Sequence, residues 1–393
     1  MQGTNDNRFK KVRVLLIEGR ARQIMPLMES MHKLGCHVTT FNTSKLDMGY
    51  ASRYPDAKIL KKCDMSDPDS YWKAVKPVLK SGKFDIAIPM FDFSAEILSK
   101  HKKELEKYVT IAVNDWDVFL YARDKQKTMQ VCMENDIPCP KTFLADDTLN
   151  DLDKMDLTYP VCIKPRSGSS AVGFRMIESP SELKEIVAAT VNKYGKSLIQ
   201  EYIPQTDLQY KAEIYIDREG KVKSACVFSK VRWYPLNGGS STLNETVDRP
   251  DIVKSCVKLL KKIKWRGYAD IDLIQDPRDG VAKIMEINPR ITGSVKICYS
   301  AGVDFSRQIV EDYLKLPVTS YRRYQKGKYL RYLHTDVLWF LKSKDRFKCK
   351  PSWFDFRNST DQIWSLKDPL PWFAYTISGF VKLKEDKKKR SLK

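Results

Sequence analysis

Asp270-Ile271-Asp272-Leu273-Ile274, the turn Asp276-Pro277-Arg278-Asp279-Gly280, and Ile284-Met285-Glu286-Ile287-Asn288-Pro289-Arg290 form the stretch that decides the fold. Turn residues between two alternating runs predict an antiparallel hairpin, in which side chains two positions apart share a face. With the turn centred near Arg278, positions 272 and 284 lie opposite each other. Asp272, Glu286 and Asn288 then point to the same side.

These three side chains offer two carboxylates and an amide oxygen. Such hard oxygen ligands suit Mg²⁺ (or Mn²⁺) together with substrate phosphates. Arg290 follows directly and could clamp the oxygens of a transferring phosphoryl group. The alternative is the solvated polar face of an ordinary hairpin. We favour the metal site because the other face is apolar, with Ile271, Leu273, Met285 and Ile287.

A second pattern places a lysine at a strand end, before a loop of small residues. It reads Lys164-Pro165-Arg166-Ser167-Gly168-Ser169-Ser170-Ala171-Val172-Gly173. Small side chains let backbone N–H groups approach phosphate oxygens while the lysine neutralises charge. The spacing is not that of a Walker A loop. Taken alone, a plain hairpin turn is the simpler interpretation.

A third pattern is an apolar strand, Leu198-Ile199-Gln200-Glu201-Tyr202-Ile203, that ends at Pro204 and is followed by Asp207. Backbone groups at such an exit could hold an adenine edge, and the carboxylate could hold ribose hydroxyls. Without the other two patterns it is an ordinary strand end.

Upstream, strands and helices alternate. Apolar runs at 12–19, 37–41, 84–90 and 110–113 are separated by helical patterns, which predicts a parallel sheet with helices on both faces over residues 1–115. A helix is expected from 118 to 135. The sequence therefore predicts an α/β unit followed by an α+β region.

Length and composition limit the class of protein. The 393 residues predict two or three packed units. Nine scattered cysteines without zinc spacing indicate reduced thiols, and no leader-like or membrane-spanning run is seen, so a cytoplasmic protein is expected. The net charge of +20 would suggest nucleic-acid binding. We do not expect it, because residues 321–393 carry 19 Lys and Arg against 7 Asp and Glu, which places +12 of that charge in one appendage.

The three patterns, in this order, resemble the ATP-grasp superfamily, from about Val12 to Leu316. The chain looks most like the branch with carbamoyl-phosphate synthase large subunits, biotin carboxylases and carboxylate–amine ligases. The resemblance implies an ATP-grasp fold preceded by a Rossmann-like parallel-sheet domain. It divides the chain into a domain over 1–115, a phosphate-lid subdomain over 116–197, an adenine and metal subdomain over 198–317, and a basic aromatic extension over 318–393.

The resemblance also implies roles for single residues. Lys125 and Lys164 contact ATP phosphates, and the segment from Ser167 through Gly168, Ser169 and Ser170 to Gly173 forms a phosphate lid. Glu201, Tyr202 and Ile203 hold adenine, and Asp207 holds ribose. Asp272, Glu286 and Asn288 bind the metal, Arg290 steadies the reacting phosphate, and Arg232, which is followed by Gly238 to Ser241, contacts substrate or the γ-phosphate. The lid has fewer glycines than in biotin carboxylases.

The implied function is an ATP-dependent ligase that activates a small carboxylate as an acyl phosphate, forms ADP, and joins it to an amine or related nucleophile. A carboxyphosphate-forming carboxylase and a non-catalytic ATP-binding interaction protein stay open as alternatives. Glu18, Asp92 and Ser94, at strand ends, are candidates for the substrate side.

The C-terminal segment interleaves Trp339, Trp353, Trp364 and Trp372 with basic residues. We favour an arm that packs on the core. The alternative is a weak peripheral contact with the inner face of a membrane. A homodimer also stays open.

Overall fold

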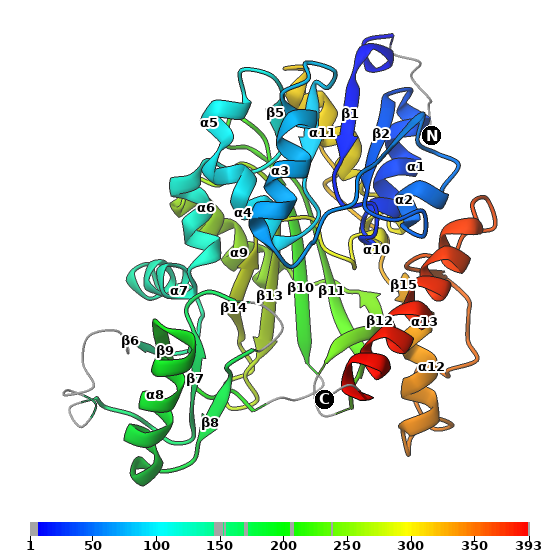
Figure 1. Ribbon diagram of the computed structural model, residues 1–393. Coiled ribbons are helices and arrows are strands. Elements are labelled where there is room, and N and C mark those ends of the chain that lie inside the picture. The colour runs from blue at the N-terminus through cyan, green and yellow to red at the C-terminus, as the bar shows by residue number, and fades with distance from the viewer. Residues whose placement is uncertain are drawn as a thin grey trace.

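The described part of the chain forms three sheets with helices around them (Figure 1). The structure is a computed structural model and describes residues 7–144, 152, 155–168, 172–204, 208–236 and 239–391. The predicted α/β unit followed by an α+β region is confirmed.

The N-terminal sheet is parallel throughout and has five strands. In order across the sheet these are β3 (Ala57–Leu60), β2 (His37–Asn42), β1 (Arg13–Leu16), β4 (Ile86–Ile88) and β5 (Thr110–Ile111). One face packs on α1 (Ile24–Leu34); the other packs on α3 (Pro68–Leu79), α4 (Asp92–Lys100) and α5 (Lys102–Leu105). The carboxyl ends of β1 and β4 therefore deliver Glu18 and Asp92 to one edge, where parallel sheets commonly bind ligands.

The helix expected from 118 to 135 is two helices, α6 (Trp116–Arg123) and α7 (Lys125–Glu134). Asp124 separates them with an extended backbone, and its side chain caps α7 by accepting from the backbone N of Gln126. The same carboxylate binds the guanidinium of Arg166. This break places Lys125 at the first position of α7, next to the loop after β7.

A small antiparallel sheet follows, in the order β6 (Thr142–Leu144), β9 (Ser197–Glu201), β7 (Val161–Pro165) and β8 (Arg175–Ile177). Helix α8 (Pro180–Tyr194) covers one face of it. The boundary predicted between 197 and 198 falls inside β9. Strand β9 belongs to this small sheet, called the lid sheet below, because Ile199 pairs with both Phe143 and Ile163.

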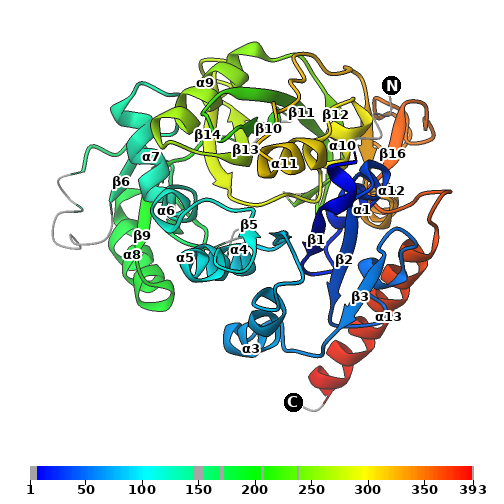
Figure 2. The same cartoon turned by 90° about the horizontal axis from the view of Figure 1, so that it is seen from above.

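The large sheet has seven strands. In order they are β14 (Ala282–Asn288), β13 (Gly267–Gln275), β10 (Gln209–Ile216), β11 (Val222–Tyr234), β12 (Ser240–Thr246), β15 (Tyr329–Arg331) and β16 (Ser359–Asp361). Its apolar face packs on α9 (Pro250–Lys262) and on α6 and α7. Helices α10 (Lys296–Ser300) and α11 (Phe305–Tyr313) lie between this sheet and α1 (Figure 2).

The predicted β13–β14 hairpin is present, but its register differs from the expected one. Asp272 pairs with Glu286 rather than with Ile284, and Leu273 pairs with Ile284, so Met285 is an extra residue in a β-bulge. The bulge turns Ile284 into the core, whereas Met285 is only half-buried. Because the bulge absorbs one residue, Asp272, Glu286 and Asn288 still share a face, as predicted.

The C-terminal segment is part of the fold, since β15 pairs with β12 and extends the large sheet. Helix α12 (Leu333–Lys342) packs on β11 and β12, and α13 (Leu370–Ser391) contacts α2 (Met48–Ala51). The packing-arm interpretation is confirmed for Trp339, which is 8% exposed, but Trp364 is 36% exposed. Within the described ranges no helix has the length and apolar character needed to cross a membrane.

Candidate active site

The polar face of the large sheet carries a compact set of opposite charges. Lys211 on β10 reaches Asp270 Oδ2 at 2.5 Å and Asp272 Oδ2 at 3.1 Å. Lys230 on β11 reaches Asp272 Oδ1 at 3.0 Å. Burial acts to raise the pKa of Asp272, but the two ammonium groups outweigh it and hold that pKa below its usual range. The sheet therefore presents ionised Asp272 next to two lysines.

Asn288 connects this charged set to the edge of the sheet. Its Nδ2 donates to Asp270 Oδ2 at 2.8 Å and to Asp272 Oδ2 at 2.9 Å. The two hydrogen bonds fix the amide so that its carbonyl oxygen points away from both aspartates. Glu286, two residues earlier on β14, has a side chain that is 35% exposed. The oxygens of Glu286 and Asn288 thus face the same open side.

Lysines approach Glu286 from the lid side of the site. Lys125 Nζ lies 3.4 Å from Glu286 Oε2 and donates to the backbone O of Gly168 at 2.9 Å. Lys164, at the end of β7, has a pKa lowered by burial, which the neighbouring Glu286 carboxylate opposes. The structure therefore brings Lys125, Lys164, Gly168 and Glu286 together, and the roles that the resemblance implies for them stay predictions.

The donor set fits Mg²⁺ by its chemistry, since Glu286 and Asn288 offer only hard oxygens. Among the described residues, no group of three or more His, Cys, Asp or Glu side chains is arranged to hold a metal. Mg²⁺ commonly uses one or two protein carboxylates and completes its shell with phosphates and water. Asp272 already has two ammonium partners, and its part as a ligand, like those of Glu286 and Asn288, stays a prediction.

The described residues that were predicted to form the phosphate lid and to hold adenine lie along β7, β8 and β9. Ser167 and Gly168 follow β7, and Gly173 has φ of +78°, with a Cβ there only 2.7 Å from Pro165 Cγ, so glycine is required. Glu201 ends β9, Tyr202 is half-buried and Ile203 is buried. Glu201 accepts from the backbone N of Lys141 at 3.1 Å and pairs with Arg278 at 2.5 Å. The calls on Ser169, Ser170 and Asp207 lie outside the described residues.

Arg290 and Asp92 join the large sheet to the N-terminal sheet. Nε and Nη2 of Arg290 donate to the two oxygens of Asp92, each at 2.9 Å. Burial alone would lower the pKa of Arg290, but Asp92 raises it, so the guanidinium stays charged. The bidentate pair aligns Arg290 beside Asn288 and Pro289.

Arg232 is not brought to this group. It is 3% exposed and pairs with Asp336 of α12 through Nε at 3.1 Å and Nη2 at 3.2 Å. Its guanidinium also lies 4.9 Å from the centre of the Trp339 ring. Arg232 therefore helps to attach the C-terminal segment to the large sheet. The structure gives no support to the contact with substrate or the γ-phosphate that was predicted for Arg232.

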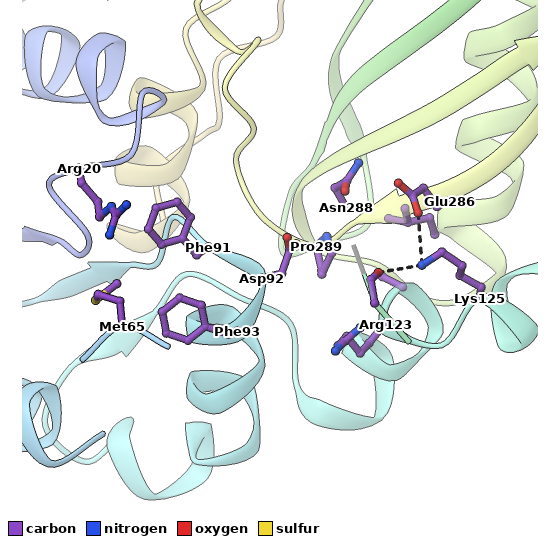
Figure 3. Close-up of a pocket in the computed structure, with 13 residues that line it drawn as sticks. Arg20, Met65, Phe91, Asp92, Phe93, Arg123, Lys125, Glu286, Asn288 and Pro289 are labelled. Carbon is purple, nitrogen blue, oxygen red and sulfur yellow. Dashed lines mark hydrogen bonds and ion pairs between the residues drawn. The ribbon is translucent and has the colours of Figure 1, made fainter. Parts of the chain in front are cut away.

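A cavity of ≈ 420 Å³ adjoins these residues (Figure 3). Glu286, Asn288, Lys125 and Gly168 line one end, and the other end is lined by residues of the N-terminal unit, namely Arg20, Met65, Phe91 and Phe93. Asp92 and Pro289 lie between the two ends in Figure 3. The cavity therefore links an end lined by a lysine, a carboxylate and an amide to an end lined by an arginine and two aromatic rings.

Glu18 supports the wall of this cavity from behind. It is 2% exposed, has a left-handed backbone, and accepts from Tyr71 Oη at 2.5 Å, from the backbone N of Met90 at 2.7 Å and from Ser94 Oγ at 3.0 Å. Burial raises its pKa to about 7, although these hydrogen bonds oppose the shift. Glu18 thus fixes the loop that carries Phe91 and Asp92.

Sequence reasoning missed Lys211, Lys230, Asp270 and the lining residues of the N-terminal unit. The alternation in Gln209–Ile216 places Lys211 and Glu213 on one face, which was an available signal for a charged sheet face. Lys230 carried no such signal, because only strand pairing places it beside Asp272.

Comparisons with known proteins agree with this geometry. A family model described as an ATP-grasp domain matches residues 122–294. D-aspartate ligase of Enterococcus faecium (strain Aus0004) is 27% identical over 255 residues, which cover 59% of this chain and 59% of that enzyme. D-alanine–D-alanine ligase A of Bacillus cereus is 23% identical over 272 residues, covering 62% of this chain and 88% of the enzyme.

A solved structure of biotin carboxylase from Campylobacter jejuni shares the fold. Its TM-score is 0.68 at 15% sequence identity, and the match covers 82% of this chain and 75% of that one. In the sequence comparison above, this chain spans less than two thirds of the length of the D-aspartate ligase. The expected fold class, an ATP-grasp fold preceded by a Rossmann-like parallel-sheet domain, is confirmed by the family match, by the shared fold and by the sheet order.

Proposed function

Since the chain belongs to the ATP-grasp superfamily, with its ATP-grasp domain over residues 122–294, we propose that it is an ADP-forming carboxylate–amine ligase. The observation that carries the proposal is the meeting of Lys125, Glu286 and Asn288 at one end of a cavity whose other end belongs to a different unit. Such a cavity can hold ATP phosphates beside a second substrate. The two curated relatives described above are both ligases.

In the proposed reaction, an oxygen of the substrate carboxylate attacks the γ-phosphorus of ATP, and ADP leaves. The amine then attacks the carbonyl carbon of the acyl phosphate, loses a proton, and releases inorganic phosphate. Lys125 and Lys164 neutralise phosphate charge, and Arg290 stabilises the charge that develops on the transferring group. Glu286 and Asn288, together with Asp272, would hold Mg²⁺, which would supply Lewis-acid stabilisation of the charge on the phosphate oxygens.

The nucleotide base would lie along Glu201, Tyr202 and Ile203, with Ser167 to Gly173 closing over the phosphates. The acid and the amine would enter from the end lined by Arg20, Phe91 and Phe93. The two substrates are small molecules in this proposal, and a cytoplasmic location and a homodimer stay predictions.

A screen for ADP release tests the proposal, with a panel of carboxylic acids and amines offered in pairs. We expect ADP only when both an acid and an amine are present, and far less of it from Glu286→Gln. Glu185→Gln is the matched control, because Glu185 is an exposed residue of α8. ADP formed with bicarbonate in place of an organic acid would favour the carboxyphosphate-forming alternative.

Binding of nucleotide separates an enzyme from a non-catalytic binder. Mg-ATP at a hundredfold excess over its dissociation constant should stabilise the protein by ~2.7 kcal/mol. Stabilisation of this size with no turnover for any pair, and no effect of Glu286→Gln on it, would favour the interaction protein. No stabilisation by Mg-ATP would contradict both.

A further inference from the structure

Large apolar side chains are exposed mainly in one part of the molecule. Among the residues that the structure describes, thirteen of the 23 strongly exposed ones fall between residues 337 and 381. This segment carries no part of the candidate active site. An accumulation of this kind commonly marks an interaction surface, whereas single exposed apolar residues do not.

Helix α13 contributes one regular stripe. Leu370, Phe373, Ile377 and Phe380 recur at helical spacing and are 61%, 50%, 50% and 63% exposed. Ala374, four residues after Leu370, borders this stripe and is 8% exposed, and Trp372 and Tyr375 pack against the core. The helix is therefore attached through these three residues and leaves the apolar stripe uncovered.

The segment after α12 contributes an aromatic cluster. Phe340 contacts the rings of Phe347, Trp353 and Phe354 at centroid distances of 5.4, 4.6 and 5.6 Å. Phe347 and Phe354 are nevertheless 72% and 59% exposed. The rings support one another while their outer faces stay uncovered.

Exposed lysines alternate with this cluster. They are Lys342, Lys344, Lys348 and Lys350. Within the described part of the chain, none of the four forms an ion pair with an Asp or Glu. Further along, residues 382–390 hold six Lys and Arg against two acidic residues. The positive charge of the four lysines is thus available to a partner.

The two helices hold these features on one side of the molecule. Tyr332 Oη lies 2.8 Å from Tyr375 Oη, and His334 Nε2 lies 2.8 Å from Thr376 Oγ1, so the start of α12 is fixed to α13. Figures 1 and 2 both show α12 and α13 on the side opposite α8 and the lid sheet.

We propose that this C-terminal surface, formed by the exposed side chains of residues 337–381, docks on an anionic lipid bilayer. Aromatic and aliphatic side chains beside lysines match the boundary between headgroups and acyl chains, where apolar groups insert and basic groups meet lipid phosphates. A protein partner is the weaker fit, because protein interfaces are depleted in lysine.

Co-sedimentation of the full chain with lipid vesicles tests the proposal. We expect binding to vesicles of phosphatidylcholine mixed with phosphatidylglycerol, little binding to phosphatidylcholine alone, and release as NaCl rises from about 0.1 M to about 1 M. Insertion should also shift the emission of Trp364, whose ring lies 6.2 Å from that of Phe373, to shorter wavelength.

Two variants with matched controls locate the surface. Replacing Lys342, Lys344, Lys348 and Lys350 by Gln should weaken binding by roughly tenfold or more. The same change at Lys45, Lys62, Lys83 and Lys107, which are also exposed, should weaken it much less. Phe373→Ser with Phe380→Ser should abolish the emission shift, whereas Leu60→Ser with Tyr194→Ser should keep it.

Three outcomes would overturn the proposal. They are absence of binding to anionic vesicles at low salt, equal losses for the test and control variants, and a dimer in sedimentation velocity that Phe373→Ser with Phe380→Ser dissociates. The last result would assign the surface to a second copy of the chain.

Discussion

Arg290 and Asp92 form a bidentate ion pair between two sheets, with both N–O distances at 2.9 Å. The arginine follows β14 of the large sheet, and the aspartate begins α4 behind the N-terminal sheet. A carboxylate in this position occupies the guanidinium fork in the way that a substrate carboxylate or a phosphoryl group would. Asp92 therefore both orients Arg290 and competes for it.

The pair leads to a first prediction. Arg290→Ala should lower kcat by ~10²–10³ with a much smaller effect on ATP affinity, because the guanidinium acts on charge that develops in the transition state. Asp92→Asn removes the same ion pair but keeps the arginine, so its loss in kcat should be less than about tenfold. Steady-state kinetics and nucleotide titrations of both variants check this. Equal losses in binding and turnover for Arg290→Ala would mean that the residue only holds nucleotide.

A second prediction concerns pH and Glu18. Burial raises the pKa of Glu18 from 4.5 to about 7, so the folded protein keeps a proton that the unfolded chain has released. The free energy of unfolding should therefore fall as pH rises from about 4.5 to about 7, and this one group should account for about 3 kcal/mol of the fall. Below about pH 4.5 Glu18 is protonated in both the folded and the unfolded state, so this loss of stability is absent.

Denaturant unfolding of the wild type and of Glu18→Gln at pH 5 and pH 8 measures this fall in the free energy of unfolding. The difference in free energy of unfolding between the two proteins should move by about 3 kcal/mol in favour of Glu18→Gln at the higher pH. Glu185→Gln should show no such movement because Glu185 is exposed. A pH-independent difference for Glu18→Gln would contradict the assignment of the raised pKa.

The β13–β14 hairpin could be predicted from the sequence in part. Alternation predicts that Asp272, Glu286 and Asn288 share a face, and they do. Alternation could not predict the bulge at Met285, because the bulge depends on how Ile284 and Ile287 fit the core formed with α9 and on the pairing with β13. On the turn side the pairing differs from the expected register by one residue, and the bulge at Met285 shifts it by one more. Because the two shifts add to two residues, the three side chains stay on one side.

Long-range pairing accounts for most of what was missed. Lys230 lies beside Asp272 only because β11 and β13 both pair with β10, and no local pattern encodes that arrangement. The same reason applies to Arg232, whose partner Asp336 lies 104 residues later in the chain. The position of β9 in the lid sheet is also set by pairing rather than by its own sequence.

Arg232 gives a third prediction, on stability. Asp336 is fully buried and also lies 3.2 Å from Arg331 Nη1. Asp336→Ala leaves two buried guanidinium groups without their carboxylate, so it should lower the free energy of unfolding by about 3–5 kcal/mol. Arg232→Met leaves Asp336 paired with Arg331 and should cost less.

Chemical denaturation of both variants, together with kcat of the folded fraction, checks this prediction. A structural role for Arg232 requires that kcat of Arg232→Met stays within a few-fold of the wild type. A stable Arg232→Met protein with a loss in turnover of ~10² or more would instead support direct contact with the substrate.

The transfer of oxygen from the acid to phosphate tests the central claim most directly. A carboxylic acid that supports turnover is prepared with ¹⁸O in its carboxylate, and the released phosphate and nucleotide are identified by mass spectrometry. If the carboxylate is phosphorylated before the amine attacks, one ¹⁸O appears in each inorganic phosphate and the nucleotide product is ADP. AMP as the product, or unlabelled phosphate while the labelled acid is consumed, would contradict the acyl-phosphate route.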